Sequence, residues 1–171
     1  NSLGTTTTNG SGAWTFTPSS SLSNGTTYTL TAKAADAAGN LSSASSAISL
    51  TIDTTAPSAP AISSPSSGSS SSDTTPDITG TAEANSTVTV YEASNSLGTT
   101  TTNGSGAWTF TPSSALSNGT TYTITAKAAD AAGNLSSASS AISLTIDTPA
   151  PAVPVITAPN SGTSSSDTTP D

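Results

Sequence analysis

Residues 95–147 read NSLGTTTTNGSGAWTFTPSSALSNGTTYTITAKAADAAGNLSSASSAISLTID, and the chain contains this stretch twice. Residues 1–53 carry the same sequence, except that Ser21 stands for Ala115 and Leu30 for Ile124. The second copy therefore follows the first at an offset of 94 residues. Solenoid and propeller repeats have periods of roughly 20 to 50 residues, whereas a small domain has about 100. The chain is therefore predicted to be a tandem array of domains.

The repeat divides the chain into one complete unit, residues 54–147, and two partial units. Residues 1–53 are the C-terminal part of an earlier unit, and residues 148–171 are the N-terminal part of a later one. Both partial units lack the segment that corresponds to residues 78–94. Two explanations stay open: the chain is a segment of a longer polypeptide, or its incomplete ends complement each other between neighbouring molecules by strand donation.

The composition excludes several classes of function. Ten acidic residues against two lysines give a net charge of −8, which removes the usual basis for binding nucleic-acid phosphates or anionic lipids. Cysteine and methionine are both absent, which excludes disulfides and thiol chemistry and suits a protein outside the cell. No apolar run approaches the roughly 18 residues of a membrane span, so we expect no membrane insertion in this segment.

The complete unit is predicted to be all-β, because short runs of Thr, Val, Ile and aromatic residues alternate with small polar residues between turn signals. The serine run at residues 69–72 is expected to be a loop. About seven short strands in one unit of this length indicate an antiparallel immunoglobulin-like sandwich. The expected strands are residues 61–64, 78–82, 87–91, 96–102, 107–111, 122–128 and 141–146.

The alternation also predicts the core of this sandwich. Trp108 and Phe110 point to the same side of their strand and are the largest apolar side chains of the unit, so we expect them at its centre. Leu97 and Leu116 are expected to point inward beside them. The other expected core residues are Tyr122, Ile124, Ala126, Ala128, Ile142, Leu144 and Ile146.

The order of several short motifs resembles a known family. The motifs are ITGTAE at residues 78–83, VTVY at 88–91, GAWTFTP at 106–112 and ADAAGN at 129–134. Together they resemble the bacterial Ig-like repeats of giant secreted surface adhesins. The resemblance implies extracellular repeats that extend an adhesive tip or build a biofilm matrix, often with calcium between domains. The chain has fewer acidic residues than calcium-rich members of that group.

One cluster of oxygen-bearing residues is a candidate metal site. In an antiparallel sandwich, alternate loops lie at the same end, which should bring Asp53, Glu83 and Asp130 together where the linker arrives, with Asn103 and Asn134 beside them. Calcium takes six to eight hard oxygen ligands, which such loops can supply. The sequence therefore predicts an inter-domain Ca²⁺ site. The alternative is that Asp and Asn only bond their own backbone to form tight turns.

No catalytic site can be assembled, because the chain has no histidine or cysteine and its serines lack a base partner. We therefore predict a non-catalytic spacer, a stiff extender for adhesion or biofilm formation, whose partners are neighbouring repeats of the same polypeptide. Two alternatives stay open. The chain is a subunit of a self-assembling filament with homotypic contacts, or it is a module that binds carbohydrate or protein, which an exposed aromatic cluster would favour.

Overall fold

The computed structural model describes residues 1–157, 162, 164 and 166, and every regular element in this part of the chain is a strand. The predicted all-β class is confirmed. The proposed partial unit at residues 148–171 is described only in part, because most residues after 157 lie outside the described residues. The complete unit contains β3 (Ala61–Ser64), β4 (Ser69–Ser71), β5 (Ile78–Thr81), β6 (Thr87–Glu92), β7 (Asn95–Thr101), β8 (Ala107–Phe110), β9 (Thr121–Ala129) and β10 (Ile142–Ile146).

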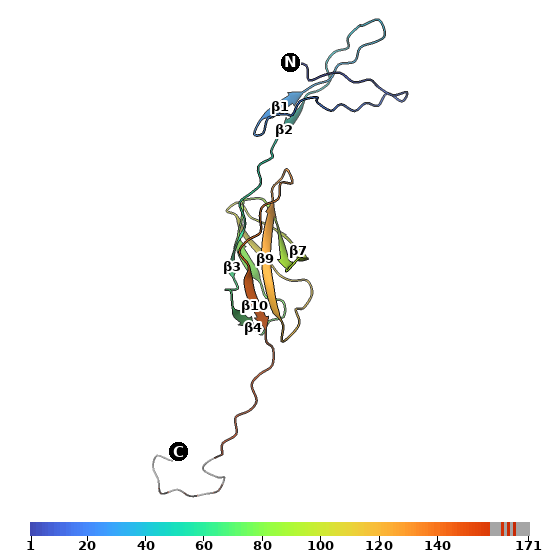
Figure 1. The fold of residues 1–171 in the computed structure, drawn as a ribbon. Coiled ribbons are helices and arrows are strands. Elements are labelled where there is room, and N and C mark those ends of the chain that lie inside the picture. Colours follow the sequence, from blue (N-terminus) through green and yellow to red (C-terminus); the bar gives the residue numbers. More distant parts are fainter. Residues whose placement is uncertain (158–161, 163, 165, 167–171) are drawn as a thin grey trace.

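These strands form two layers (Figure 1). One sheet has the order β3-β5-β8 and the other has the order β4-β10-β9-β6-β7. All neighbours pair antiparallel except β4 and β10, which run parallel. The arrangement is the immunoglobulin-like sandwich that the strand pattern predicts.

The core lies between the two layers. Trp108 and Phe110, both on β8, are 3% and 6% exposed. They face the apolar side of the larger sheet, where alternate residues of β6 and β9 are buried because successive side chains of a strand point to opposite faces. Tyr122 is only half-buried, and Leu97 packs against the core from β7. Leu116 joins Leu144 and Ile146 in a second buried cluster at the other end.

The expectation of a loop at residues 69–72 is wrong for three of its residues. Ser69–Ser71 form β4, which pairs with Leu144–Ile146 of β10. Serine has a low strand propensity, so the local sequence gives no strand signal. The strand forms because β10 would otherwise expose an unpaired edge, and the hydrogen bond from Gly68 N–H to the Ser143 carbonyl (N···O 2.7 Å) starts the pairing.

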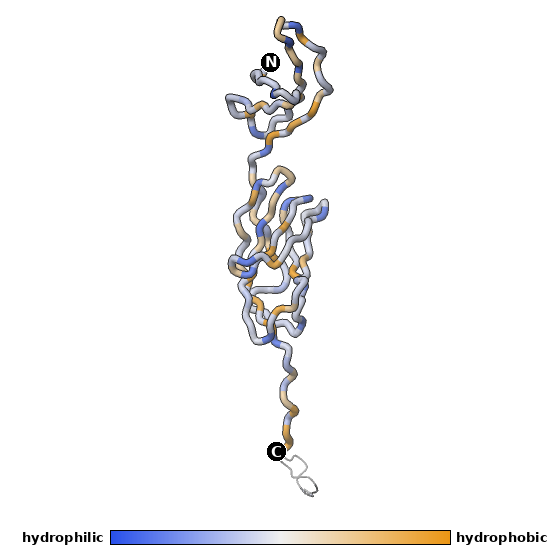
Figure 2. Tube along the Cα trace, turned by 90° about the vertical axis from the view of Figure 1, so that its right-hand side faces the viewer, coloured by the Kyte–Doolittle hydropathy of each residue, from blue (hydrophilic) through white to orange (hydrophobic). Residues whose placement is uncertain are grey.

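The partial unit at residues 1–53 is much more open. It contains β1 (Thr27–Leu30) and β2 (Ile48–Thr51), which pair antiparallel in the register that β9 and β10 also use. No residue from 1 to 56 is buried. Figure 2 shows that apolar residues occur in this part of the chain as well, where no second layer covers them. In the described residues, no helix has the length and apolar character that a membrane crossing requires.

Candidate functional site at the repeat junction

The linker between the two units is short, and its second half is fixed on the complete unit. Pro57 and Pro60 are buried, although the linker residues around them are exposed. Proline also restricts the backbone angle φ at its own position and the conformation of the residue before it. The prolines therefore do not fix residues 53–56, and the orientation of this segment depends on other contacts.

The preceding unit holds this segment through Asn24. The Asn24 Oδ1 atom accepts a hydrogen bond from Thr54 N–H (2.7 Å), and Asn24 Nδ2 donates one to Thr55 Oγ1 (2.8 Å). In the complete unit, Asn118 Oδ1 accepts the equivalent bond from Thr148 N–H (2.9 Å). Both asparagines therefore tie the end of a unit to the linker that follows it.

The complete unit holds the same segment from the other side through Asn134. Asn134 Nδ2 donates one hydrogen bond to the Asp53 carbonyl oxygen (3.0 Å) and another to Asp130 Oδ2 (2.8 Å). Asp130 Oδ1 in turn accepts from the backbone N–H groups of Ala132 (2.8 Å) and Asn134 (2.9 Å). These donors, first the Asn134 side chain, hold the pKa of the Asp130 carboxyl below its ordinary value. The turn thus orients Asn134 toward the linker.

Glu83 and Asn103 lie in two other loops that contact each other at the linker end of the sandwich. The Glu83 carbonyl oxygen accepts a hydrogen bond from Thr102 Oγ1 (2.6 Å), and Glu83 and Ser58 of the linker are among the residues that line a shallow groove. Asn103 Oδ1 accepts from Ser105 N–H (3.0 Å), Ser105 Oγ (2.7 Å) and Ala107 N–H (3.0 Å). No hydrogen bond among the described residues joins Glu83 or Asn103 to the group formed by Asp53, Asp130 and Asn134.

The arrangement does not present a ready-made cation cage. Within the described residues, no three or more acidic, histidine or cysteine side chains come close enough to hold one ion. Both Asp130 oxygens and Asn103 Oδ1 already accept hydrogen bonds, and Asp53 Oδ1 accepts one from Thr55 N–H (2.9 Å). A calcium ion would have to replace several of these bonds. Calcium binding at Asp53, Glu83, Asn103, Asp130 and Asn134 stays a prediction from the sequence.

Sequence reasoning missed the linker contacts of Asn24 and Asn118. Both residues precede a glycine, and neither was selected as a candidate functional residue. Each lies about 30 residues before the linker residue that it contacts, so no local pattern reveals the pairing. The only available signal was that Asn-Gly recurs at a fixed distance from the end of each unit.

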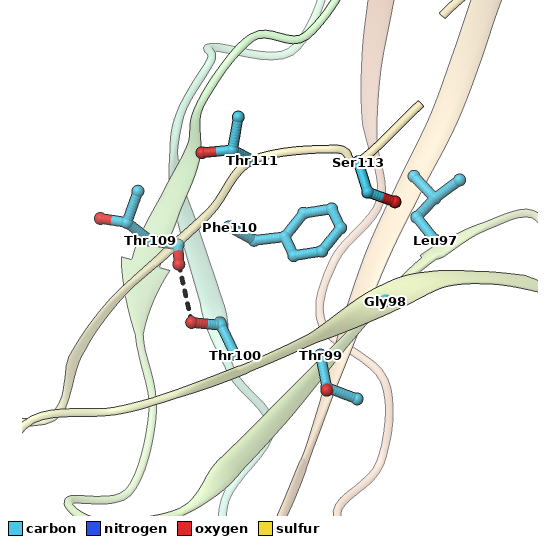
Figure 3. A pocket seen from close by; sticks show the side chains of 8 residues that line it. All are labelled: Leu97, Gly98, Thr99, Thr100, Thr109, Phe110, Thr111 and Ser113. Atoms are coloured by element: carbon cyan, nitrogen blue, oxygen red, sulfur yellow. Dashed lines mark hydrogen bonds between the residues drawn. The ribbon is translucent and has the colours of Figure 1, made fainter. Parts of the chain in front are cut away.

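A second surface bears on the binding-module alternative. A shallow groove of about 340 Å³ runs between β7 and β8, where the Phe110 ring points toward Leu97 and Thr100 Oγ1 donates a hydrogen bond to the Thr109 carbonyl oxygen (2.8 Å; Figure 3). Half of its lining residues are threonines, and its one aromatic ring is 6% exposed. Carbohydrate binding usually needs an accessible aromatic face, and this groove does not offer one.

Comparison with known proteins gives one matching family model and several similar proteins. The family model described as bacterial Ig-like domain matches residues 1–54 and 57–148. Chitinase A1 of Niallia circulans is 41% identical over 131 residues, which are 73% of this chain and 18% of the chitinase. The chain thus spans less than a fifth of that relative. Among solved structures, the BSP domain of a biofilm-associated protein gives a TM-score of 0.42 at 24% identity, covering 75% of this chain and 20% of that one. The D00-D0 domain of intimin gives 0.32 at 24% identity, covering 69% and 64%.

Proposed function

The chain belongs to the bacterial Ig-like domain family, and we propose that it is a non-catalytic structural repeat of an extracellular bacterial surface protein, in which it serves as a stiff extender. In this proposal, residues 54–147 are the complete repeat, and residues 1–53 and 148–171 belong to its neighbours. Its partners are the adjacent repeats of the same polypeptide. The extender carries a distal adhesive or biofilm-forming part away from the cell.

The hydrogen-bonded junction is the observation that carries this proposal. Asn24 from one unit and Asn134 from the next hold the same four-residue segment, and buried prolines follow it. The chain enters the complete unit at one end and leaves it at the opposite end (Figure 1). A junction that resists bending between units of this kind yields a long rod, which is the mechanical requirement for an extender.

The pairing of the last strand, β10, with β4 near the start of the unit also suits a load along the long axis. β4 and β10 lie next to each other and run parallel, with Ser69–Ser71 paired to Leu144–Ile146. A force that pulls the two ends apart slides these strands past each other, so their hydrogen bonds share the load instead of breaking one after another. This geometry favours mechanical resistance.

The test uses a protein of two consecutive copies of residues 54–147, which recreates the Asp-Thr-Thr-Ala-Pro junction. We expect solution scattering to give an extended particle with a narrow distribution of lengths. Replacing both Asn118 and Asn134 with alanine should broaden that distribution and shorten the mean length without unfolding either repeat. The matched control is Asn95→Ala, an exposed asparagine at the start of β7. A broad distribution of lengths in the unsubstituted protein would contradict the extender proposal, and equal stiffness in all three proteins would show that the two asparagines do not stiffen the junction.

A second candidate function is a spacer within a larger secreted enzyme, which the match to part of chitinase A1 favours. As a spacer, the chain should not be retained on insoluble chitin. Retention would instead favour the carbohydrate-binding alternative. The filament alternative makes a separate prediction, because complementary ends would cause concentration-dependent growth of the particles in light scattering.

A further inference from the structure

Four Asn-Gly dipeptides occur in the chain, two in each copy of the repeated stretch. At such a step, the backbone nitrogen of the glycine attacks Cγ of the asparagine side chain, because glycine has no Cβ to shield that nitrogen. The N–Cγ bond forms, the Cγ–Nδ2 bond breaks, and the amide proton leaves with Nδ2 as ammonia. Water then opens the cyclic imide to aspartate or isoaspartate. The dipeptides are Asn9-Gly10, Asn24-Gly25, Asn103-Gly104 and Asn118-Gly119.

We propose that Asn103, and its copy Asn9, are sites of spontaneous deamidation by water, whereas the fold protects Asn118 and its copy Asn24. The four dipeptides have the same sequence, so any difference between them comes from the structure and from the next residue along the chain. Two independent features of the hydrogen bonding divide them in the same way.

The first feature is the state of the attacking nitrogen. Gly119 N–H donates a hydrogen bond to the Ile146 carbonyl oxygen (N···O 2.7 Å), and Gly25 N–H donates one to the Ile52 carbonyl oxygen (2.8 Å). Attack requires this N–H to leave its acceptor and lose its proton, which needs a local opening. Gly104 N–H makes no hydrogen bond in the described part of the chain, and Gly104 is exposed. Its nitrogen is free to react.

The second feature is the polarisation of the asparagine carbonyl. Asn103 Oδ1 accepts three hydrogen bonds, from Ser105 N–H, Ser105 Oγ and Ala107 N–H. Attack on Cγ places negative charge on this oxygen, and preorganised donors stabilise such a charge. Among the described residues, Asn118 Oδ1 accepts only the bond from Thr148 N–H. The bonds that fold the turn therefore also activate Asn103.

The same three bonds exist in the first copy. Asn9 Oδ1 accepts from Ser11 N–H (3.0 Å), Ser11 Oγ (2.7 Å) and Ala13 N–H (2.9 Å). Conversion of Asn103 or Asn9 to aspartate keeps Oδ1 as an acceptor, so the turn tolerates it and gains one negative charge. At Asn24, the same conversion would remove the donor to Thr55 Oγ1. The fold thus protects Asn24, which holds the linker, from deamidation.

The test is to incubate the full chain in mildly alkaline buffer and to follow all four sites by peptide mass spectrometry and an isoaspartate assay. We expect Asn103 to deamidate about tenfold faster than Asn118, the upper end of what one backbone hydrogen bond gives. In concentrated urea, the two rates should converge. Ser105→Ala should slow Asn103 by roughly 2- to 10-fold through loss of one donor.

Gly104→Ala provides the matched control, because a Cβ at Gly104 meets no atom within 4 Å and should leave the fold intact. It should nearly abolish reaction at Asn103 and leave Asn118 unchanged. Two outcomes would overturn the proposal. The first is an equal deamidation rate at Asn103 and Asn118 in the folded chain. The second is a ratio of the two rates that stays the same in urea, because such a ratio would come from the neighbouring residues in the sequence and not from the fold.

Discussion

Residues 1–53 and residues 95–147 differ at two positions, yet only the second stretch has a core. Trp14 is 55% exposed and its copy Trp108 is 3% exposed. Ile48 is 64% exposed, whereas its copy, Ile142, is 8% exposed. Burial of these side chains is therefore not encoded in the stretch itself.

The two copies do share their turns. The Asp36 carboxylate accepts from Ala38 and Asn40 N–H groups just as Asp130 accepts from Ala132 and Asn134. The Tyr28 hydroxyl accepts from Ser23 N–H as the Tyr122 hydroxyl accepts from Ser117 N–H. The local sequence is sufficient for these contacts, since the partners are at most five residues apart.

The difference comes from the strands that precede the second copy. β8 pairs with β5, and β9 pairs with β6. Residues 1–53 contain no counterparts of β5 and β6, so the segment around Trp14 has no strand to pair with and forms no strand itself. Residues 61–92 therefore complete the sandwich, whereas the repeated stretch alone forms turns and one hairpin.

The largest effect should come from removing the two tryptophans separately. Trp108→Ala should lower the free energy of unfolding by about 3–5 kcal/mol, because it empties the centre of the core. Trp14→Ala should change it by less than about 0.5 kcal/mol, as exposed substitutions usually do. Urea denaturation followed by circular dichroism measures both. Equal losses would mean that the first copy also has a packed core.

A smaller effect is expected from two glycines that lie under phenylalanine rings. A Cβ at Gly98 would lie 2.8 Å from Phe110 Cε2, and one at Gly4 would lie 2.7 Å from Phe16 Cε2. Both glycines have φ near +140°, so the backbone strain is the same. Gly98→Ala should cost an additional ~1–3 kcal/mol, because the buried Phe110 ring cannot move aside. The same urea titration should show a smaller cost for Gly4→Ala, and the reverse order would contradict this account.

The pH dependence should be the same in the two copies, because it arises in the shared turn. The Asn40 and Asn134 side chains and nearby N–H groups hold the pKa values of Asp36 and Asp130 below the ordinary value. A carboxyl with a lowered pKa in the folded state stabilises that state at neutral pH. This contribution is lost as the pH falls from about 4, the ordinary aspartate pKa, through the lowered value.

Carboxyl titration by NMR gives both pKa values directly. Asp130→Asn should reduce the loss of stability in acid, measured as the thermal midpoint across that pH range. A pKa at or above the ordinary value for either aspartate would show that its turn does not form in solution.

Calcium should have the smallest effect. The oxygens of the predicted site already accept hydrogen bonds, so the thermal midpoint should be nearly the same with calcium and with a chelator. A clear rise with calcium that Asp130→Ala abolishes would instead support the inter-domain site predicted from the sequence. A rise that survives both Asp53→Ala and Asp130→Ala would place the ion elsewhere.

The strand pattern predicted the sandwich because each buried strand alternates over several residues, as in β6, β9 and β10. It did not predict β4, whose serines become a strand only because β10 has a free edge. The five residues of the candidate site were selected as possible metal ligands. In the described part of the chain, the side chains of all of them except Glu83 make hydrogen bonds within the protein. Whether an oxygen in a loop faces an ion or its own backbone depends on side-chain orientation, which residue spacing does not determine.

The same stretch is packed in one copy and open in the other. Amide hydrogen exchange of the full chain measures this difference directly. A peptide that contains Leu30 and the equivalent peptide that contains Ile124 have the same mass when both are cleaved at the same positions. Chromatography separates them. We expect the amides of β9 to exchange at least about a hundredfold more slowly than the equivalent amides at residues 27–35, since core strands open only with global unfolding. Equal protection in the two copies would contradict the account.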